Sequence, residues 1–541
     1  MSNNNKKWVV FAPIILSVLM VGSYLTGRFT TKNEPQKMDV YSQINSLSNM
    51  LPTSKFGQIL SLIDAKYVDN VDIDTLSEEY IGKMLHKLDP HSAYIPAKDA
   101  VESNEHLQGE FDGIGVMFNM ATDTAIIQSV ISGGPSQKVG VLGGDRIITV
   151  GDSIIAGRKM PNEKVIGMLK GKGGTTVTIG VERFGVDTLL HFDIVRGKIP
   201  IKSIDAVYMV NEEVGYIKLL QFARTTHEEF TEAVEKLRAQ GMKKLIFDLT
   251  GNSGGYLDQA ILIANEFLPK DKMIVYTQGR KSKLAEQYSD GNGRFQSEEL
   301  VVMIDEGSAS ASEIVAGALQ DNDRGTLVGR RSFGKGLVQQ QIPFNDGSLM
   351  NLTIARYHTP TGRSIQRPYD NGYEEYYQDL FNRYVHSEML NRDSIKLVDS
   401  LEYTTPKGKI VYGGGGIMPD EFVPMDTTLL TDNTRKLLVD NTLFYFTLRY
   451  TDKNRKVISS LDTMDKVKEY FEVNGDKIYE EFLAYARTKR RIGLTDEEEI
   501  LVKNYIFSYL ARNCNETDDG FYYYFNRMNE VFNAAVEIIV D

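Results

Sequence analysis

The chain has 541 residues, 42% of them hydrophobic and 25% charged, which is typical of a globular protein with several domains. Its net charge of −12, from 61 basic and 73 acidic residues with no basic run, argues against nucleic acid as a partner. One cysteine, Cys514, excludes an intramolecular disulfide and a cysteine-based zinc site, and the seven scattered histidines form no HExxH-type pair. We therefore expect neither a metal ion nor another cofactor.

The N-terminus begins with a candidate membrane segment. Lys6 and Lys7 precede twenty uncharged residues, 8–27, and that length can just span a bilayer. No clear small-x-small cleavage site follows, so we interpret residues 1–29 as an uncleaved signal anchor or a signal peptide. The polar residues 30–45 are expected to form a tether.

Residues 46–98 are expected to form an N-terminal helical region. Apolar residues recur there at helical spacing, for example at Phe56, Ile59, Leu60 and Ile63. The region ends in Leu-Asp-Pro-His-Ser-Ala-Tyr, residues 88–94, which the Asp-Pro pair marks as a turn. His91 is therefore interpreted as a turn residue and not as a metal ligand.

Residues 99–199 alternate short strands and turns around a glycine loop. The loop consists of Gly113, Ile114, Gly115 and Val116. Consecutive N–H groups in such a loop can hold a terminal carboxylate while the peptide adds to a sheet edge. With its Gly-Asp-Arg turn at 144–146, the region resembles a PDZ domain. A structural β-domain without a ligand is the alternative, and the intact loop favours binding.

Residues 200–426 are expected to form an α/β core. A buried strand at 244–249 leads through Thr-Gly-Asn-Ser-Gly-Gly, 250–255, into a helix at 257–267. A Gly-Gly turn before a helix directs free N–H groups at a developing oxyanion. Phosphate binding is the alternative for this loop, but neither a P-loop lysine nor a GxGxxG motif is present.

The next strand, 300–304, passes through small residues into a helix at 314–319, and such a turn can present a nucleophilic serine together with half of an oxyanion hole. Three serines compete for that role: Ser308, Ser310 and Ser312. Further along, Lys335 stands between two glycines, and a desolvated lysine there has a lowered pKa and can act as a base. The alternative is an ordinary serine-rich turn and a solvated loop lysine.

These motifs, in this order, resemble the C-terminal processing (tail-specific) proteases, which use a Ser-Lys pair. The matching segments are 307–320, Phe-Gly-Lys-Gly at 333–336, Gln339, 357–366 and 413–420. The resemblance implies that Ser310 is the nucleophile, Lys335 the general base and Gln339 the residue that orients the lysine. It also implies that the N–H groups of Gly254 and Ala311 form the oxyanion hole.

The same resemblance implies a multidomain α/β and α+β fold: a crotonase/ClpP-like protease core with an inserted PDZ-like domain and helical terminal regions. Its implied substrates are proteins or peptides with free C-termini. It also implies the extracytoplasmic, periplasmic face of the inner membrane, with residues 8–27 as the anchor, or export if that segment is cleaved. One departure is Thr250, where the family usually has arginine.

Two later segments carry no recognised chemistry. The tyrosine-rich acidic residues 369–384 are expected to be a solvated insertion. Residues 427–541 carry apolar stripes at helical spacing and are expected to form a helical extension. That extension could cover the protease, dimerise or bind a partner, which leaves a homodimer or an adaptor protein open.

We therefore expect a serine endopeptidase that cleaves proteins near their C-termini. One alternative is a catalytically silent PDZ scaffold or adaptor. Another is an esterase in which a histidine, for example His358, replaces the lysine as base. The presence of Lys335 favours the protease over both.

Overall fold

The computed structural model describes residues 55–120, 123–131, 133–397, 399–428, 431–514 and 517–540. The expected membrane segment, 8–27, lies outside these residues. None of the described helices combines the length and the apolar character that crossing a bilayer requires. The chain divides into two compact units, 1–77 and 78–541.

The first unit contains helix α3 (Lys55–Lys66) and the start of α4 (Ile73–Leu85), so the helices expected in this region are present. Helix α3 has no buried residue. Phe56, Ile59 and Leu62 are exposed within the part of the chain described, and Leu60 and Ile63 are half-buried.

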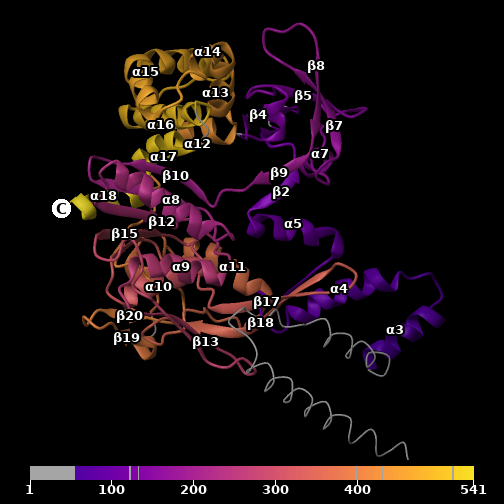
Figure 1. Cartoon of the computed structure of the whole chain (residues 1–541), viewed down its shortest axis with the longest axis vertical. Coiled ribbons are helices and arrows are strands. Elements are labelled where there is room, and N and C mark those ends of the chain that lie inside the picture. The colour runs from indigo at the N-terminus through magenta and orange to yellow at the C-terminus, as the bar shows by residue number, and fades with distance from the viewer. Residues whose placement is uncertain are drawn as a thin grey trace, which may run out of the picture. The chain divides into compact units, whose positions relative to one another are not determined.

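The second unit is built on a six-stranded sheet with the order β10-β11-β12-β15-β16-β21. Figure 1 labels β10, β12 and β15 of this sheet. Its strands are β10 (Ile204–Met209), β11 (Val214–Leu219), β12 (Lys244–Asp248), β15 (Glu299–Ile304), β16 (Thr326–Gly329) and β21 (Glu421–Phe422). Strand β10 is antiparallel to β11, and all the other neighbours are parallel. The carboxyl ends of β11, β12 and β15 therefore meet at one edge, where the candidate catalytic turns begin.

Both faces of this sheet are covered, which explains its nearly continuous apolar strands. Helices α8 (Thr226–Ala239), α9 (Leu257–Phe267) and α10 (Ala311–Asp321) contribute to the core on one face. The C-terminal helix α18 (Glu530–Val540) packs on the other through Val531, Phe532, Ala535 and Ile539.

A second, five-stranded antiparallel sheet carries the segment that follows Lys335. Its strands are β1 (Ala93–Ile95), β13 (Met273–Gln278), β14 (Ala285–Tyr288), β17 (Leu337–Pro343) and β18 (Leu349–His358). A small hairpin is formed by β19 (Glu402–Thr404) and β20 (Ile410–Tyr412).

The inserted β-domain follows helix α5 (Ala97–Gln108) and is joined to the core by a two-stranded ribbon, β2 (Glu110–Gly113) with β9 (Gly197–Pro200). Its sheet has the order β3-β4-β5-β7-β8, with β6 beside β5. The elements are β3 (Val116–Asn119), β4 (Ala125–Val130), α6 (Pro135–Lys138), β5 (Arg146–Val150), β6 (Ser153–Ile154), α7 (Asn162–Leu169), β7 (Thr176–Glu182) and β8 (Leu190–Val195). Among the described strands, β3 pairs only with β4, so its other edge is where a peptide could add.

The C-terminal region is helical, as expected, and has its own apolar core. Its helices are α12 (Asp432–Val439), α13 (Thr442–Lys453), α14 (Arg455–Ile458), α15 (Met464–Arg487), α16 (Asp496–Ala511) and α17 (Asp519–Phe525), followed by α18. The α/β core, the inserted β-domain and the helical C-terminal region confirm the expected fold class.

One expectation was wrong. The tyrosine-rich segment is not a solvated insertion, because it forms helix α11 (Tyr373–Val385) with Tyr376 and Arg383 buried. These two residues are seven positions apart and therefore share a helix face. The Arg383 guanidinium donates to the carbonyl oxygens of Ser332 (2.8 Å) and Phe333 (3.1 Å), so α11 packs against the loop that carries Lys335.

Candidate active site

Of the three competing serines, only Ser310 has a hydroxyl proton that is not committed elsewhere. The buried Ser308 hydroxyl donates to the Leu249 carbonyl oxygen, and the buried Ser312 hydroxyl donates to the Asn252 carbonyl oxygen, both at 2.8 Å. The Ser310 hydroxyl donates to no residue in the described part of the chain. The two buried serines therefore support the turn, and Ser310 is left as the candidate nucleophile.

The backbone of Ser310 is held in an unusual conformation. Its φ of 54° and ψ of −110° lie in a region that residues with a Cβ rarely adopt, and such conformations persist only where the surroundings impose them. The Ser310 N–H donates to Glu313 Oε2 at 2.8 Å, one turn into α10. The strand-to-helix turn therefore fixes where the Ser310 side chain starts.

The Glu313 carboxylate joins this turn to the lysine loop. Its Oε2 also accepts from the Lys335 N–H (2.9 Å), while Oε1 accepts from the Gly334 N–H (2.7 Å) and the Ser332 hydroxyl (2.5 Å). Complete burial raises the pKa of Glu313, and these hydrogen bonds oppose the rise. Sequence reasoning missed this residue, although the spacing Ser-x-x-Glu at a helix start is the signal of a reciprocal cap.

A second residue that the sequence did not single out, Tyr357, contacts the same two backbone segments. Its buried hydroxyl lies 2.7 Å from the Lys335 carbonyl oxygen and 3.2 Å from the Ser310 carbonyl oxygen. One hydroxyl proton is thus shared between the two candidate catalytic residues. The spacing between their backbones is set by Glu313 on one side and Tyr357 on the other.

Lys335 itself is half-buried, and burial lowers the pKa of its ammonium, with opposing contributions from Glu313 and Asp89. A lowered pKa is what a lysine base requires. No hydrogen bond joins Lys335 Nζ to Ser310 or Gln339 within the described residues. The lysine charge is instead close enough to His91 to contribute to that residue's depressed pKa.

Gln339 points to a different partner. Its Nε2 donates to Thr353 Oγ1 at 3.2 Å, and Thr353 Oγ1 in turn donates to Asp89 at 3.1 Å. Strand β17 shifts its register against β18 between Val338 and Gln339. The structure therefore places Gln339 in the strand after Lys335 without bringing their side chains together.

The two expected oxyanion donors lie beside Ser310. Gly254 has φ 102°, and a Cβ there would stand 2.9 Å from the Ala311 nitrogen and 2.8 Å from Ser310 Cβ. The Ala311 N–H has no acceptor among the described residues, whereas the Gly254 N–H donates to Asn252 Oδ1 at 2.9 Å. In this conformation, only the first of the two N–H groups is available to an oxyanion.

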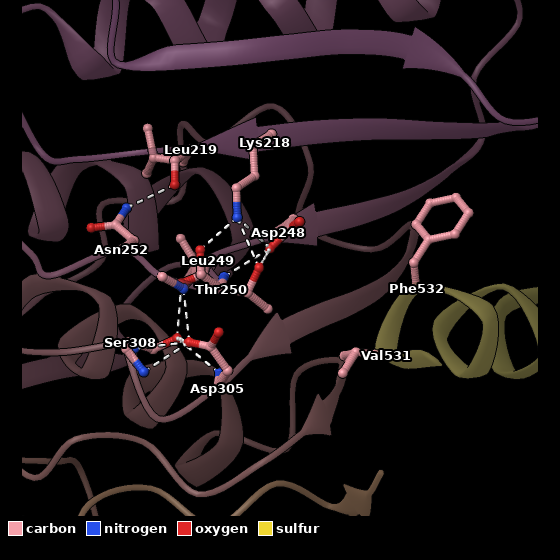
Figure 2. Close-up of polar contacts among 12 residues, drawn as sticks. Lys218, Leu219, Asp248, Leu249, Thr250, Asn252, Asp305, Ser308, Val531 and Phe532 are labelled. Carbon is pink, nitrogen blue, oxygen red and sulfur yellow. Dashed lines mark hydrogen bonds and ion pairs between the residues drawn. The ribbon is translucent and has the colours of Figure 1, made fainter. Parts of the chain in front are cut away.

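The turn that carries Gly254 is hydrogen-bonded directly to the turn that carries Ser310 (Figure 2). The Gly251 N–H donates to Asp305 Oδ1 (2.7 Å), and the Ala309 N–H donates to the Asn252 carbonyl oxygen (2.9 Å). The Asn252 side chain also donates to the Leu219 carbonyl oxygen at 3.0 Å. Each turn is therefore a support for the other.

The glycine loop of the β-domain presents free donors at the start of its edge strand. The Ile114 and Gly115 carbonyl oxygens accept from Ser136 and Ile131, at 3.0 and 2.9 Å. Their own N–H groups donate to no described acceptor, and Gly115 has φ 75°, which suits glycine. Gly113 pairs with Gly197 in the ribbon, and Val116 begins β3. The loop thus has the form of a carboxylate site.

His358 does not contact Ser310. Its Nδ1 lies 3.2 Å from the Gly362 carbonyl oxygen, and its ring stacks on Tyr276 with a centroid separation of 4.7 Å. These contacts give no support to a serine-histidine esterase.

Three family models match the chain. Residues 213–372 match peptidase family S41, residues 113–194 match a PDZ domain, and residues 434–516 match a family of unknown function. The first match contains Ser310 and Lys335, and the third covers most of the C-terminal helices.

Among curated relatives, the carboxy-terminal-processing protease of Bartonella bacilliformis is 37% identical over 360 residues, 66% of this chain and 79% of the relative. The carboxy-terminal processing protease CtpB of Bacillus subtilis is 32% identical over 365 residues, 65% of this chain and 75% of the relative. A solved structure of a photosystem II D1 C-terminal processing protease is 25% identical, covers 60% of this chain and 88% of its own, and has a TM-score of 0.34.

Proposed function

The chain belongs to the carboxy-terminal processing proteases of peptidase family S41, and on that premise we propose that it is a Ser-Lys endopeptidase with Ser310 as nucleophile and Lys335 as general base. The observation that carries the proposal is the shared backbone support of these two residues. A single carboxylate, Glu313, accepts hydrogen bonds from both of their N–H groups.

The chemistry follows the usual sequence of a serine peptidase. Neutral Lys335 takes the Ser310 hydroxyl proton as Oγ attacks the scissile carbonyl carbon. The Ala311 N–H stabilises the oxyanion, and the Gly254 N–H joins it after leaving Asn252. The lysine then gives its proton to the leaving amine, and water attacks the acyl-enzyme with Lys335 again as base. Gln339 orients the lysine once Nζ turns towards it.

Substrate selection belongs to the PDZ domain in this proposal. The N–H groups of Ile114 and Gly115, which donate to no described acceptor, support capture of a terminal carboxylate. The edge of β3 that pairs with no described strand supports addition of the extended peptide behind it. Amidation of a peptide's C-terminus should therefore weaken its capture. Equal cleavage of free-acid and amidated peptides would remove the loop from substrate recognition.

The location is part of the same proposal. The uncharged residues 8–27 behind Lys6 and Lys7 support an anchor that holds the protease on the extracytoplasmic face, or a signal that exports it. External proteinase added to spheroplasts should degrade the protein while it spares cytoplasmic markers. Protection until the cells are lysed would contradict this placement.

A fluorophosphonate probe tests the nucleophile. The wild-type protein should be labelled and should hydrolyse casein, and Ser310→Ala should lose both properties. Ser308→Ala is the matched comparison, because its hydroxyl supports the turn and it should keep the label once folded. A labelled Ser310→Ala protein would refute the assignment. Peptide binding by an unlabelled, inactive wild type would favour the scaffold.

The pH profile tests the base. Because only the neutral amine accepts a proton, activity should rise with pH through the Lys335 pKa, which burial places below the ordinary lysine value. Lys335→Arg should be folded and inactive, because the guanidinium remains protonated. Near-normal turnover in that variant would exclude Lys335 as the base.

A further inference from the structure

Lys218 is a buried cation that takes no part in the chemistry above. It is the fifth residue of β11, its side chain is only 6% exposed, and it pairs with Asp248 at the end of β12. Strand register places these two residues directly opposite each other, at the edge where the oxyanion turn begins. Burying an ammonium group costs free energy, so the hydrogen-bond partners of Lys218 indicate which part of the structure it stabilises.

Two of the three hydrogen bonds of Lys218 go to the turn itself (Figure 2). Nζ lies 2.5 Å from the Thr250 carbonyl oxygen, 2.8 Å from Thr250 Oγ1 and 3.0 Å from Asp248 Oδ1. Asp248 Oδ1 also accepts from the Thr250 N–H and hydroxyl, both at 2.7 Å. The first residue of the turn is therefore fixed at its N–H, its carbonyl and its side chain.

The turn needs such support because its backbone is unusually free. Gly251, Gly254 and Gly255 have φ values of 68°, 102° and 148°, and glycine populates many other conformations. Asp305, Ser308 and Ala309 hold the side of the turn that faces the nucleophile. Lys218 and Asp248 hold the side that faces the sheet, so the donor of Gly254 is positioned from both directions.

The C-terminal helix supports this arrangement from behind. The Tyr216 hydroxyl donates to Asp248 Oδ2 at 2.6 Å, and the Phe532 ring of α18 packs edge-on against the Tyr216 ring, with centroids 5.4 Å apart. Figure 2 shows Phe532 on α18, beyond Asp248 from the turn. The C-terminal helix thus contacts the residue that fixes the second carboxylate oxygen.

We propose that Lys218 is a positioning residue of the protease, which holds the oxyanion turn through Thr250 and Asp248. This inference rests on the proposed function, since the turn matters only if it serves an oxyanion. Lys218 needs only one hydrogen bond to pair with the charge of Asp248. For stability alone, an apolar pair of similar volume could replace the two residues. The two bonds to Thr250 are those that a purely structural ion pair would not need.

The test compares Lys218→Met and Thr250→Val with Lys244→Met. Thr250→Val removes the Oγ1 acceptor of Lys218 Nζ and keeps the ion pair between Lys218 and Asp248. It therefore tests the contact between Lys218 and the turn even if Lys218→Met fails to fold. Lys244 is a matched control: it lies at the other end of β12, pairs with Glu299 and donates to the Ile539 carbonyl oxygen of α18. Lys244→Met should leave kcat within about twofold of the wild-type value.

Hydrolysis of a quenched-fluorescent peptide with a free C-terminus gives kcat and KM, and fluorophosphonate labelling reports on Ser310 separately. Lys218→Met should lower kcat by about 10- to 100-fold and leave KM nearly unchanged. This decrease is no larger than the decrease in kcat that follows removal of one oxyanion donor. Thr250→Val should lower kcat by about 3- to 10-fold, because one of the Nζ contacts is lost. The labelling rate should fall in parallel.

Unchanged kcat in folded Lys218→Met or in Thr250→Val would overturn the inference while the protease function stands. A fall in melting temperature alone, with normal kcat, would also overturn it, because that is the signature of a structural ion pair. Absence of Ser310-dependent hydrolysis in the wild type would refute the proposed function, and the positioning role with it. The wild-type measurement thus separates the two failures.

Discussion

The Tyr357 hydroxyl lies 2.7 Å from the carbonyl oxygen of Lys335. Tyr357 belongs to β18, which also pairs with β17, the strand that follows Lys335. The same hydroxyl is 3.2 Å from the Ser310 carbonyl oxygen. Because Tyr357 is buried, its proton has no water to replace these acceptors. The spacing between the backbones of Ser310 and Lys335 therefore depends on the Tyr357 hydroxyl as well as on Glu313.

Tyr357→Phe should lower kcat by about 3- to 10-fold, which corresponds to about 0.7–1.4 kcal/mol, the net value of one hydrogen bond. The ring remains, so the variant should fold. Tyr276→Phe in the neighbouring strand β13 is the control, because Tyr276 stacks on His358 and not on the catalytic loops. Equal kcat values for the two variants would show that the Tyr357 hydroxyl does not set the geometry.

The local structure around the candidate site could be predicted from the sequence. The strand, small-residue turn and helix expected around Ser310 are present as β15 and α10, and the helix expected at 257–267 is α9 with the same bounds. These elements depend on apolar periodicity and on glycine, which act over a few residues. The roles assigned to Ser310, Lys335 and Gln339 remain predictions.

The supports of the site could not be predicted in the same way. Tyr357 reaches Ser310 across 47 positions, and the link from Asp248 to α18 runs through Tyr216 and Phe532, far apart in the chain. No local pattern marks such contacts. The burial of helix α11 could not be predicted for a related reason. The sequence does not distinguish an arginine that is buried against backbone carbonyl oxygens, such as Arg383, from a solvated arginine.

Gly254→Ala should abolish peptidase activity. A methyl group there would lie 2.8 Å from both the Ala309 carbonyl oxygen and Ser310 Cβ, and φ of 102° is unfavourable for alanine. The collision falls on the nucleophile turn, so kcat should fall by at least about 100-fold. The measurement is hydrolysis together with fluorophosphonate labelling.

Gly251→Ala is the matched comparison for Gly254→Ala. Gly251 also has a positive φ, 68°, but a methyl group there meets nothing within 4 Å. Backbone strain is therefore present in both variants, and the collision in only one. Losses of the same size would mean that strain in the turn, and not contact with Ser310, causes the effect.

The stability of the protein should depend on His91 below neutral pH. Burial first, and then the charge of Lys335, lowers the pKa of His91 to about 3, with Asp89 opposing and Arg367 adding to the shift. In the unfolded chain the pKa is about 6.5. Between these values only the unfolded state binds the proton, so stability is present above pH 6.5 and is lost as the pH falls towards 3.

His91→Gln should remove this pH dependence. At pH 7.5 the variant should be less stable than the wild type, because the 2.8 Å contact between His91 Nε2 and the Tyr376 hydroxyl is weakened. At pH 4.5 the difference in unfolding free energy should shrink or reverse, because only the wild type has a buried histidine that must stay unprotonated in the folded state. Urea unfolding at both pH values measures it. A constant difference between the two proteins would contradict the assignment.

The PDZ domain should be held by an ionic contact with the C-terminal helices. Asp452 of α13 accepts from Arg146 of β5 at 2.8 Å and pairs with Arg455 at 2.9 Å. Arg455 also lies 3.7 Å from Asp145. Asp452 is only 7% exposed, so this contact is poorly screened by solvent. The ribbon of β2 and β9 connects the domain covalently to the core.

Asp452→Asn should therefore loosen the PDZ domain without unfolding it. Losing the charged partner should cost about 1.5–3 kcal/mol of docking free energy, the usual value of a hydrogen bond between charged groups. Amide hydrogen exchange should accelerate in β5 and in α13. Asp462→Asn is the control, because its partner Lys466 is on the exposed surface of the same helical region. If exchange in β5 is the same in both variants, the Asp452 contact does not hold the PDZ domain.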